Sequence, residues 1–70
     1  MTKNINTLLP EVWKDSKNKP ISCSEKIKIL NENIIEINRM MEDAIEDAEL
    51  MGADSNQVIN ILKKSLDNTN

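Results

Sequence analysis

The sequence predicts an all-α fold in which a long helix and a short helix form a helical hairpin or corner after a short N-terminal arm. Three observations predict it. No Gly or Pro occurs between Pro20 and Gly52, so this stretch can form one uninterrupted helix. Apolar residues within it recur at alternating spacings of three and four. Trp13 is the only aromatic residue, and the remaining aliphatic residues suit packing between helices.

The arm is expected to comprise residues 1–21 and to contain a short helical turn. Leu9, Val12 and Trp13 have the spacing that places side chains on one side of a helix, and Pro10 suits a first helical turn. Trp is also the residue type most enriched where proteins bind one another. The arm therefore has two interpretations. Trp13 folds back on its own protein, or these three residues bind another protein.

The long helix is expected over about 23–51. Ser22 and Glu25 match a capping box, in which each side chain accepts a hydrogen bond from a free amide at the start of a helix. Gly52 suits the left-handed position that ends a helix. Such a helix is about 43 Å long at roughly 1.5 Å per residue.

The strongest pattern in the sequence is a heptad seam along this helix. Its residues are Ile27, Leu30, Ile34, Ile37, Met41, Ala44, Ala48 and Met51. Cys23 extends the series by one step, which predicts a buried thiol in the seam. Ile29, Ile35 and Leu50 fall outside this stripe and suggest a second contact surface, such as one for the arm.

A turn at 52–54 leads to the second helix, expected over about 55–67. Asp54 or Ser55 can cap it, and its apolar face extends from Val58 to Leu66. The helical hairpin then spans residues 22–67, and residues 68–70 are expected to fray. A helix of about 12 residues covers only about 18 Å of the long helix. The end of the seam from Ile27 to Ile37 would stay exposed.

We therefore expect a second copy to complete the core, giving a homodimeric helical bundle. A chain of 70 residues is marginal alone, and its single cysteine, Cys23, excludes an internal disulfide. The expected dimer interface comprises Ile27, Leu30, Ile34, Ile37 and Met41.

Charge is distributed unevenly along the chain. Residues 1–39 contain seven Lys/Arg and five Asp/Glu, giving +2, whereas residues 40–70 contain two Lys and seven Asp/Glu, giving −5. The acidic cluster comprises Glu42, Asp43, Glu46, Asp47 and Glu49. It is interpreted as a solvated face or as a docking surface for a basic partner. A metal site is disfavoured because the chain has no histidine.

One segment resembles a helix-turn-helix motif. The apolar and small residues that carry the resemblance are Ala48, Met51, Gly52, Ala53, Val58 and Ile61. Its second helix would present the polar residues Ser55, Asn56, Gln57, Asn60, Lys63 and Lys64, some of which can read bases. The acidic cluster on the preceding helix would repel phosphates, so nucleic acid is not the favoured partner.

These patterns predict a protein without catalytic residues or cofactors. No glycine-rich phosphate loop, Ser/His/Asp set or metal-ligand set occurs in the sequence. No signal peptide or membrane-spanning run is recognised, and one unpaired thiol suits a reducing compartment, so a cytoplasmic location is expected. The favoured function is a protein-interaction module, a small dimeric adaptor or regulator of a larger protein. The alternatives are a small DNA-binding regulator and a structural subunit of a larger assembly.

Overall fold

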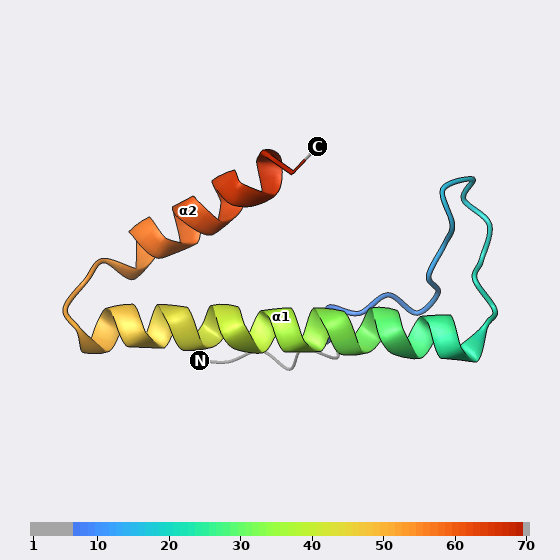
Figure 1. Ribbon diagram of the computed structural model, residues 1–70, viewed down its shortest axis with the longest axis horizontal. Coiled ribbons are helices and arrows are strands. Elements are labelled where there is room, and N and C mark those ends of the chain that lie inside the picture. Colours follow the sequence, from blue (N-terminus) through green and yellow to red (C-terminus); the bar gives the residue numbers. More distant parts are fainter. Residues whose placement is uncertain (1–6, 70) are drawn as a thin grey trace. The chain divides into compact units, whose positions relative to one another are not determined.

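The computed structural model describes residues 7–69, and its regular secondary structure is entirely helical (Figure 1). Helix α1 comprises Ser24–Leu50 and helix α2 comprises Ser55–Asp67. The predicted all-α class is confirmed, because the only β-type pairing in the described part is an isolated bridge between Lys14 and Pro20. The chain divides into two compact units, Met1–Asn38 and Arg39–Asn70, which we describe separately.

Cys23, not Ser22, is the residue that caps the start of α1. The carbonyl of Cys23 accepts a hydrogen bond from the backbone N–H of Ile27 at 3.1 Å, which is the first helical bond. The backbone N–H groups of Lys26 and Glu25 hydrogen-bond the Cys23 sulfur. These are the second and third amides of α1, the groups that an N-cap side chain normally satisfies. The sequence predicted the start of α1 one residue too early, and the predicted capping box of Ser22 and Glu25 does not form the cap.

Gly52 ends α1 as the sequence predicted. Its φ angle is +79°, in the left-handed region where glycine has no side chain to clash. The N–H of Ala53 donates to the carbonyl of Ala48 at 2.8 Å, and the N–H of Gly52 donates to the carbonyl of Glu49 at 3.2 Å. This pair of bonds is a Schellman motif, which satisfies carbonyls left free at a helix end.

Asp54 caps α2, one of the two residues predicted for this role. Its backbone is extended, with φ −80° and ψ 111°, and its carboxylate accepts from the N–H of Asn56 at 2.9 Å. At the other end of α2, Asn68 donates its backbone N–H to the carbonyl of Lys64, and the Thr69 hydroxyl donates to the carbonyl of Leu66. These two residues belong to the segment expected to fray; its last residue, Asn70, lies outside the described residues.

In the first unit, the arm contains a tight hairpin between Trp13 and Ile21. The backbone N–H of Asp15 donates to the carbonyl of Lys19 at 2.8 Å, and the N–H of Asn18 donates to the carbonyl of Asp15 at 2.9 Å. The Asp15 carboxylate accepts from two further backbone N–H groups of the turn, each at 2.9 Å. Asn18 has a φ of 67°, which Asn tolerates better than most residues. Asp and Asn thus fix the turn through their side-chain chemistry.

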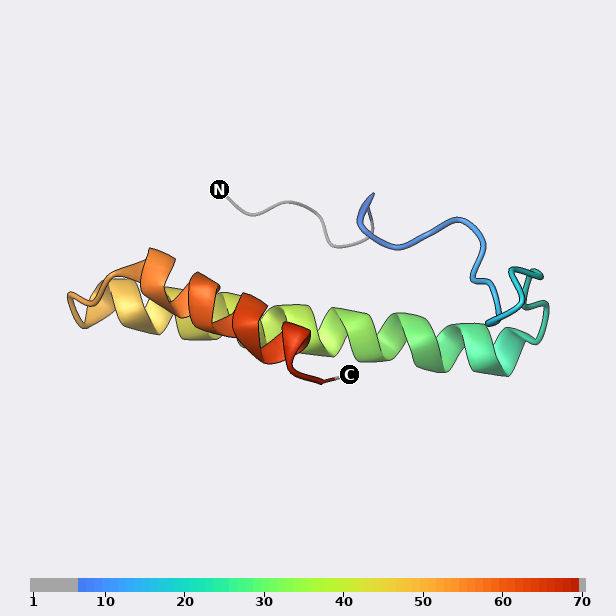
Figure 2. The ribbon, with the colours of Figure 1, turned by 90° about the horizontal axis from the view of Figure 1, so that it is seen from above.

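The helical turn predicted around Leu9, Val12 and Trp13 is absent; residues 8–13 form bends and turns. The carbonyl of Trp13 accepts from the backbone N–H of Ile21 at 2.7 Å and is therefore part of the hairpin. Too few residues then remain after Pro10 to nucleate a helix. Figures 1 and 2 show that residues 7–21 of the arm fold back along the N-terminal half of α1.

In the second unit, α2 packs against the C-terminal half of α1, with the Met51–Asp54 turn between them (Figure 1). Ala48 is the only buried apolar residue in the described part of the chain, at 4% exposure. Met41 and Ile45 on α1, and Val58 and Leu62 on α2, are half-buried. Neither described helix is long and apolar enough to cross a membrane.

Candidate interaction surfaces

The N-terminal and C-terminal halves of α1 are each partly covered by their own unit. The half-buried residues of the first half are Ile27, Leu30, Asn31, Ile35 and Asn38, and the covered residues of the second half are Met41, Ile45 and Ala48. Ile35 was predicted to lie off the seam, on a second contact surface. It is half-buried, whereas Ile34, a seam residue, is 38% exposed.

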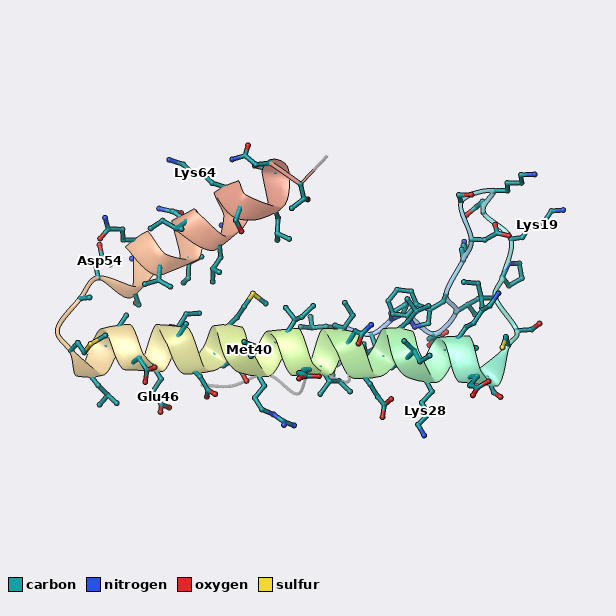
Figure 3. All side chains as sticks on the ribbon, viewed as in Figure 1. Lys19, Lys28, Met40, Glu46, Asp54 and Lys64 are labelled. Atoms are coloured by element: carbon teal, nitrogen blue, oxygen red, sulfur yellow. The ribbon has the colours of Figure 1, made fainter. Side chains whose placement is uncertain are left out.

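Most residues of α1 are exposed, and we call one series of them, continued into the turn that follows α1, the exposed stripe. It comprises Lys26, Asn33, Ile37, Met40, Ala44, Asp47 and Met51, all of which are exposed. With the half-buried Leu30, these residues are spaced alternately by four and three, the repeat of a helix-packing seam. Ile37 is 52% exposed and Met40 is 67% exposed. Figure 3 labels Met40 on α1.

The exposed stripe shares three positions with the predicted seam, namely Ile37, Ala44 and Met51, and is rotated from it around the helix. Of the five residues predicted for the dimer interface, Ile27, Leu30 and Met41 are half-buried within the chain. Ile34 and Ile37 are exposed. The sequence pattern therefore identified the apolar side of α1. It did not distinguish the part that the chain itself covers from the part that remains free.

All five residues of the acidic cluster are exposed: Glu42, Asp43, Glu46, Asp47 and Glu49. At about 100° per residue, only Asp47 falls on the exposed stripe, and the other four lie outside it. Figure 3 labels Glu46 of this cluster on α1. In residues 7–69, no group of three or more His, Cys, Asp or Glu residues could hold a metal ion.

The three residues of the arm that were predicted to bind a partner differ in how far they are buried. Trp13 is half-buried, and its indole N–H donates to the side-chain oxygen of Asn31 on α1 at 2.7 Å. Leu9 is half-buried and Val12 is exposed. The indole is thus held within its own chain, which matches the interpretation that Trp13 folds back.

Cys23 is exposed, so the prediction of a buried seam thiol is wrong. The physical reason is its position at the N-cap, before the first turn of α1, where the side chain points to the helix end. The backbone N–H groups of Lys26 and then Glu25 stabilise the thiolate and lower the pKa of Cys23 below its ordinary value.

The corner between α1 and α2 carries the residues of the helix-turn-helix resemblance. The polar residues Asn56, Gln57, Asn60, Lys63 and Lys64 of α2 are exposed, and Ser55 is half-buried. Figure 3 labels Lys64 on α2 and Asp54 at its start. Phosphates that approached these lysines would also meet the acidic residues of the same unit.

Sequence reasoning missed two features that hold the arm in place. Asn31 is a polar residue beside the seam, and its position next to Ile27 and Leu30 was the available signal for a buried polar contact. The hairpin was signalled by Asp15 and Asn18, residue types that form turns through their side chains.

Comparison with known proteins does not extend this description, because no protein family, curated protein or solved structure matches the chain.

Proposed function

We propose that this chain is a non-enzymatic protein-interaction module, a small dimeric helical adaptor or regulator of a larger protein. The observation that supports it is the small size of the core. Only Ala48 is a buried apolar residue among residues 7–69, while large aliphatic side chains such as Ile37 and Met40 are exposed. Each large aliphatic side chain that leaves water stabilises a protein by roughly 1.5–3 kcal/mol. A partner that covers these side chains would supply the buried apolar surface that the chain lacks.

A second copy is the partner that we propose for the exposed stripe. Helix α1 has 27 residues and α2 has 13, so α2 is too short to cover the length of α1. A second α1 has the same length and the same repeat of positions. Most of the acidic cluster would remain on the outside of such a dimer, where it would meet a larger protein that carries positive charge.

Sedimentation equilibrium in the micromolar range tests this proposal with two matched variants. Ile37→Lys places a charge on the exposed stripe, and Leu50→Lys makes the same change at a residue that is 78% exposed and lies outside the stripe. We expect the wild type and Leu50→Lys to be dimers. Ile37→Lys should shift toward the monomer, because a buried lysine must lose its hydration. A monomeric wild type would contradict the proposal.

A DNA-binding regulator remains the second function suggested by the sequence. Its support is the exposed polar face of α2, with Lys63 and Lys64. The net charge of −5 over residues 40–70 argues against it, because binding to DNA depends on neutralising phosphates. Salt-dependent binding to duplex DNA, lost in the double variant Lys63→Gln/Lys64→Gln, would favour this alternative. A structural subunit would instead remain monomeric and become ordered only on a different chain.

The proposed module acts in the cytoplasm. Its single thiol, Cys23, is exposed and has a lowered pKa, which favours the reactive thiolate. In an oxidising compartment this thiol would form mixed disulfides, whereas a reducing compartment keeps it free.

A further inference from the structure

We propose that residues 8–21 form a strap that closes one face of α1 and opens while the helix stays folded. The strap belongs to the same compact unit as the N-terminal half of α1, and Figures 1 and 2 show it folded back along that half. The closed face comprises the half-buried residues Ile27, Asn31 and Ile35, which are spaced by four and share one side of the helix. None of them belongs to the exposed stripe, so this device goes beyond the proposed dimer and does not depend on it.

The strap is held together by hydrogen bonds of its own. The backbone N–H of Ile21 donates to the carbonyl of Trp13 at 2.7 Å, and the N–H of Asp15 donates to the carbonyl of Lys19 at 2.8 Å. The Asp15 carboxylate accepts from two further backbone N–H groups inside the turn. None of these bonds reaches α1, so none of them has to break when the strap leaves the helix.

Within the described residues, a single hydrogen bond joins the strap to α1. The indole N–H of Trp13 donates to the side-chain oxygen of Asn31 at 2.7 Å, and this contact is partly buried. Asn31 lies in the middle of the closed face, between Ile27 and Ile35. Beneath a purely aliphatic segment its amide would lose its hydration without gaining a partner, which is unfavourable. The indole covers apolar surface and also carries a donor, so this face is matched to Trp13.

The apolar contacts of the strap are incomplete, and this incompleteness allows it to open. None of its residues is buried: Leu8 is 61% exposed, Val12 is 51% exposed, and the half-buried ones are Leu9, Trp13 and Ile21. Figure 3 shows that the hairpin carries Lys19 away from α1. Segments with few buried apolar contacts open at a lower free energy than the elements they cover. The 27 residues of α1 keep their own backbone hydrogen bonds in the open form.

Opening of the strap would give α1 a second accessible apolar surface. Ile27, Leu30 and Ile35, which are half-buried in the closed form, would then be available to another chain. The apparent affinity of such a chain is reduced by the fraction of molecules that remain closed. The strap is therefore an autoinhibitory contact, and the bond between Trp13 and Asn31 is the latch that sets the open fraction.

Urea titrations followed by two probes on the same sample test the opening of the strap. The emission of Trp13, the only aromatic residue, reports on the strap, and circular dichroism reports on the helices. We expect the Trp13 signal to change at a lower urea concentration than the helical signal, because the strap opens first. Both probes are read at one protein concentration, so the comparison applies to a monomer or a dimer. Coincident transitions would show that strap and helices unfold as one unit and would overturn the proposal.

Two substitutions of similar shape at Asn31 test the latch. Asn31→Asp keeps an oxygen acceptor for the indole, whereas Asn31→Leu removes the acceptor and adds apolar surface. We expect Asn31→Asp to keep the wild-type midpoint of the Trp13 signal, and Asn31→Leu to lower it, with the open form about two- to tenfold more populated. Helix propensity favours Leu over Asp, so a change in the stability of α1 would produce the opposite order. A midpoint for Asn31→Leu at or above that of the wild type would overturn the proposal.

Discussion

The hydrogen bond between Trp13 and Asn31 is the residue-scale contact that fastens the arm to α1. The donor and acceptor lie 2.7 Å apart and are both half-buried. Such a bond contributes about 1 kcal/mol, and more is lost when one partner is left unpaired away from water. Trp13 is also the only aromatic residue, so its fluorescence reports on this contact alone.

Asn31→Ala should release the arm without disturbing α1. Alanine favours helix, so circular dichroism should show unchanged helical content. We expect the emission of Trp13 to shift to the red and its quenching by iodide to increase, because the indole loses its partner and becomes exposed. The control is Asn60→Ala, which removes an exposed amide from α2 in the other unit. An Asn31→Ala spectrum identical to that of the control would contradict the role of this bond.

Cys23 should titrate below an ordinary thiol in the native protein. Its sulfur accepts from two backbone amides at the start of α1, which favours the thiolate and lowers its pKa. The pKa is therefore lower in the folded chain than in the unfolded chain. The resulting stabilisation is present above the unfolded pKa and is lost as the pH falls through the folded pKa.

The pH dependence of alkylation by iodoacetamide measures this difference. We expect the midpoint of the rate profile to lie at lower pH for the native protein than for the protein in urea. Cys23→Ser should retain the helix, because serine is a good N-cap residue. Equal midpoints in the two conditions would show that the amides do not stabilise the thiolate.

At the scale of the helices, the acidic cluster opposes the stability of α1. Glu42 and Glu46, and Asp43 and Asp47, are like-charge pairs four residues apart, and all four are exposed. Each such pair costs about 0.2–0.5 kcal/mol. The cluster also lies toward the C-terminus of α1, where the helix dipole disfavours negative charge.

The double variant Glu42→Gln/Asp43→Asn removes both pairs and leaves the exposed stripe unchanged. We expect its free energy of unfolding in urea to rise by about 0.4–1 kcal/mol at low salt. Glu11→Gln, which neutralises an exposed carboxylate outside the helices, should have little effect. A clear loss of stability in the double variant would mean that these carboxylates make specific contacts.

The sequence predicted those parts of the helices that depend on nearby residues. Gly52 and Asp54 determine the turn between α1 and α2 through their own backbone and side-chain chemistry, and both were identified. The start of α1 was predicted less well, because Ser22 and Glu25 match a capping box, whereas the first helical hydrogen bond in the structure is donated by the N–H of Ile27 to the carbonyl of Cys23.

The sequence also could not predict how much of the apolar face of α1 the chain itself covers. The heptad spacing gives the side of the helix that avoids water but not how widely the chain's own segments cover it. Asn31 and Asn38 are polar and half-buried, whereas Ile37 is apolar and exposed. Hydrophobicity alone would predict that the two asparagines are exposed and that Ile37 is buried.

At the scale of the whole molecule, the chain is short of buried apolar surface. A domain of this size is marginal even when its core is complete. Here only Ala48 is a buried apolar residue in the described part, while the stripe through Ile37 and Met40 is exposed. We therefore propose that association of two copies completes the fold.

The concentration dependence of thermal unfolding tests this claim most directly. If folding and dimerisation are coupled, mass action stabilises the native state as the protein concentration rises. We predict that the Tm of the wild type, followed by circular dichroism, increases steadily across the micromolar range, and that it does so much less for Ile37→Lys. A cooperative wild-type transition with the same Tm at every concentration would contradict the claim.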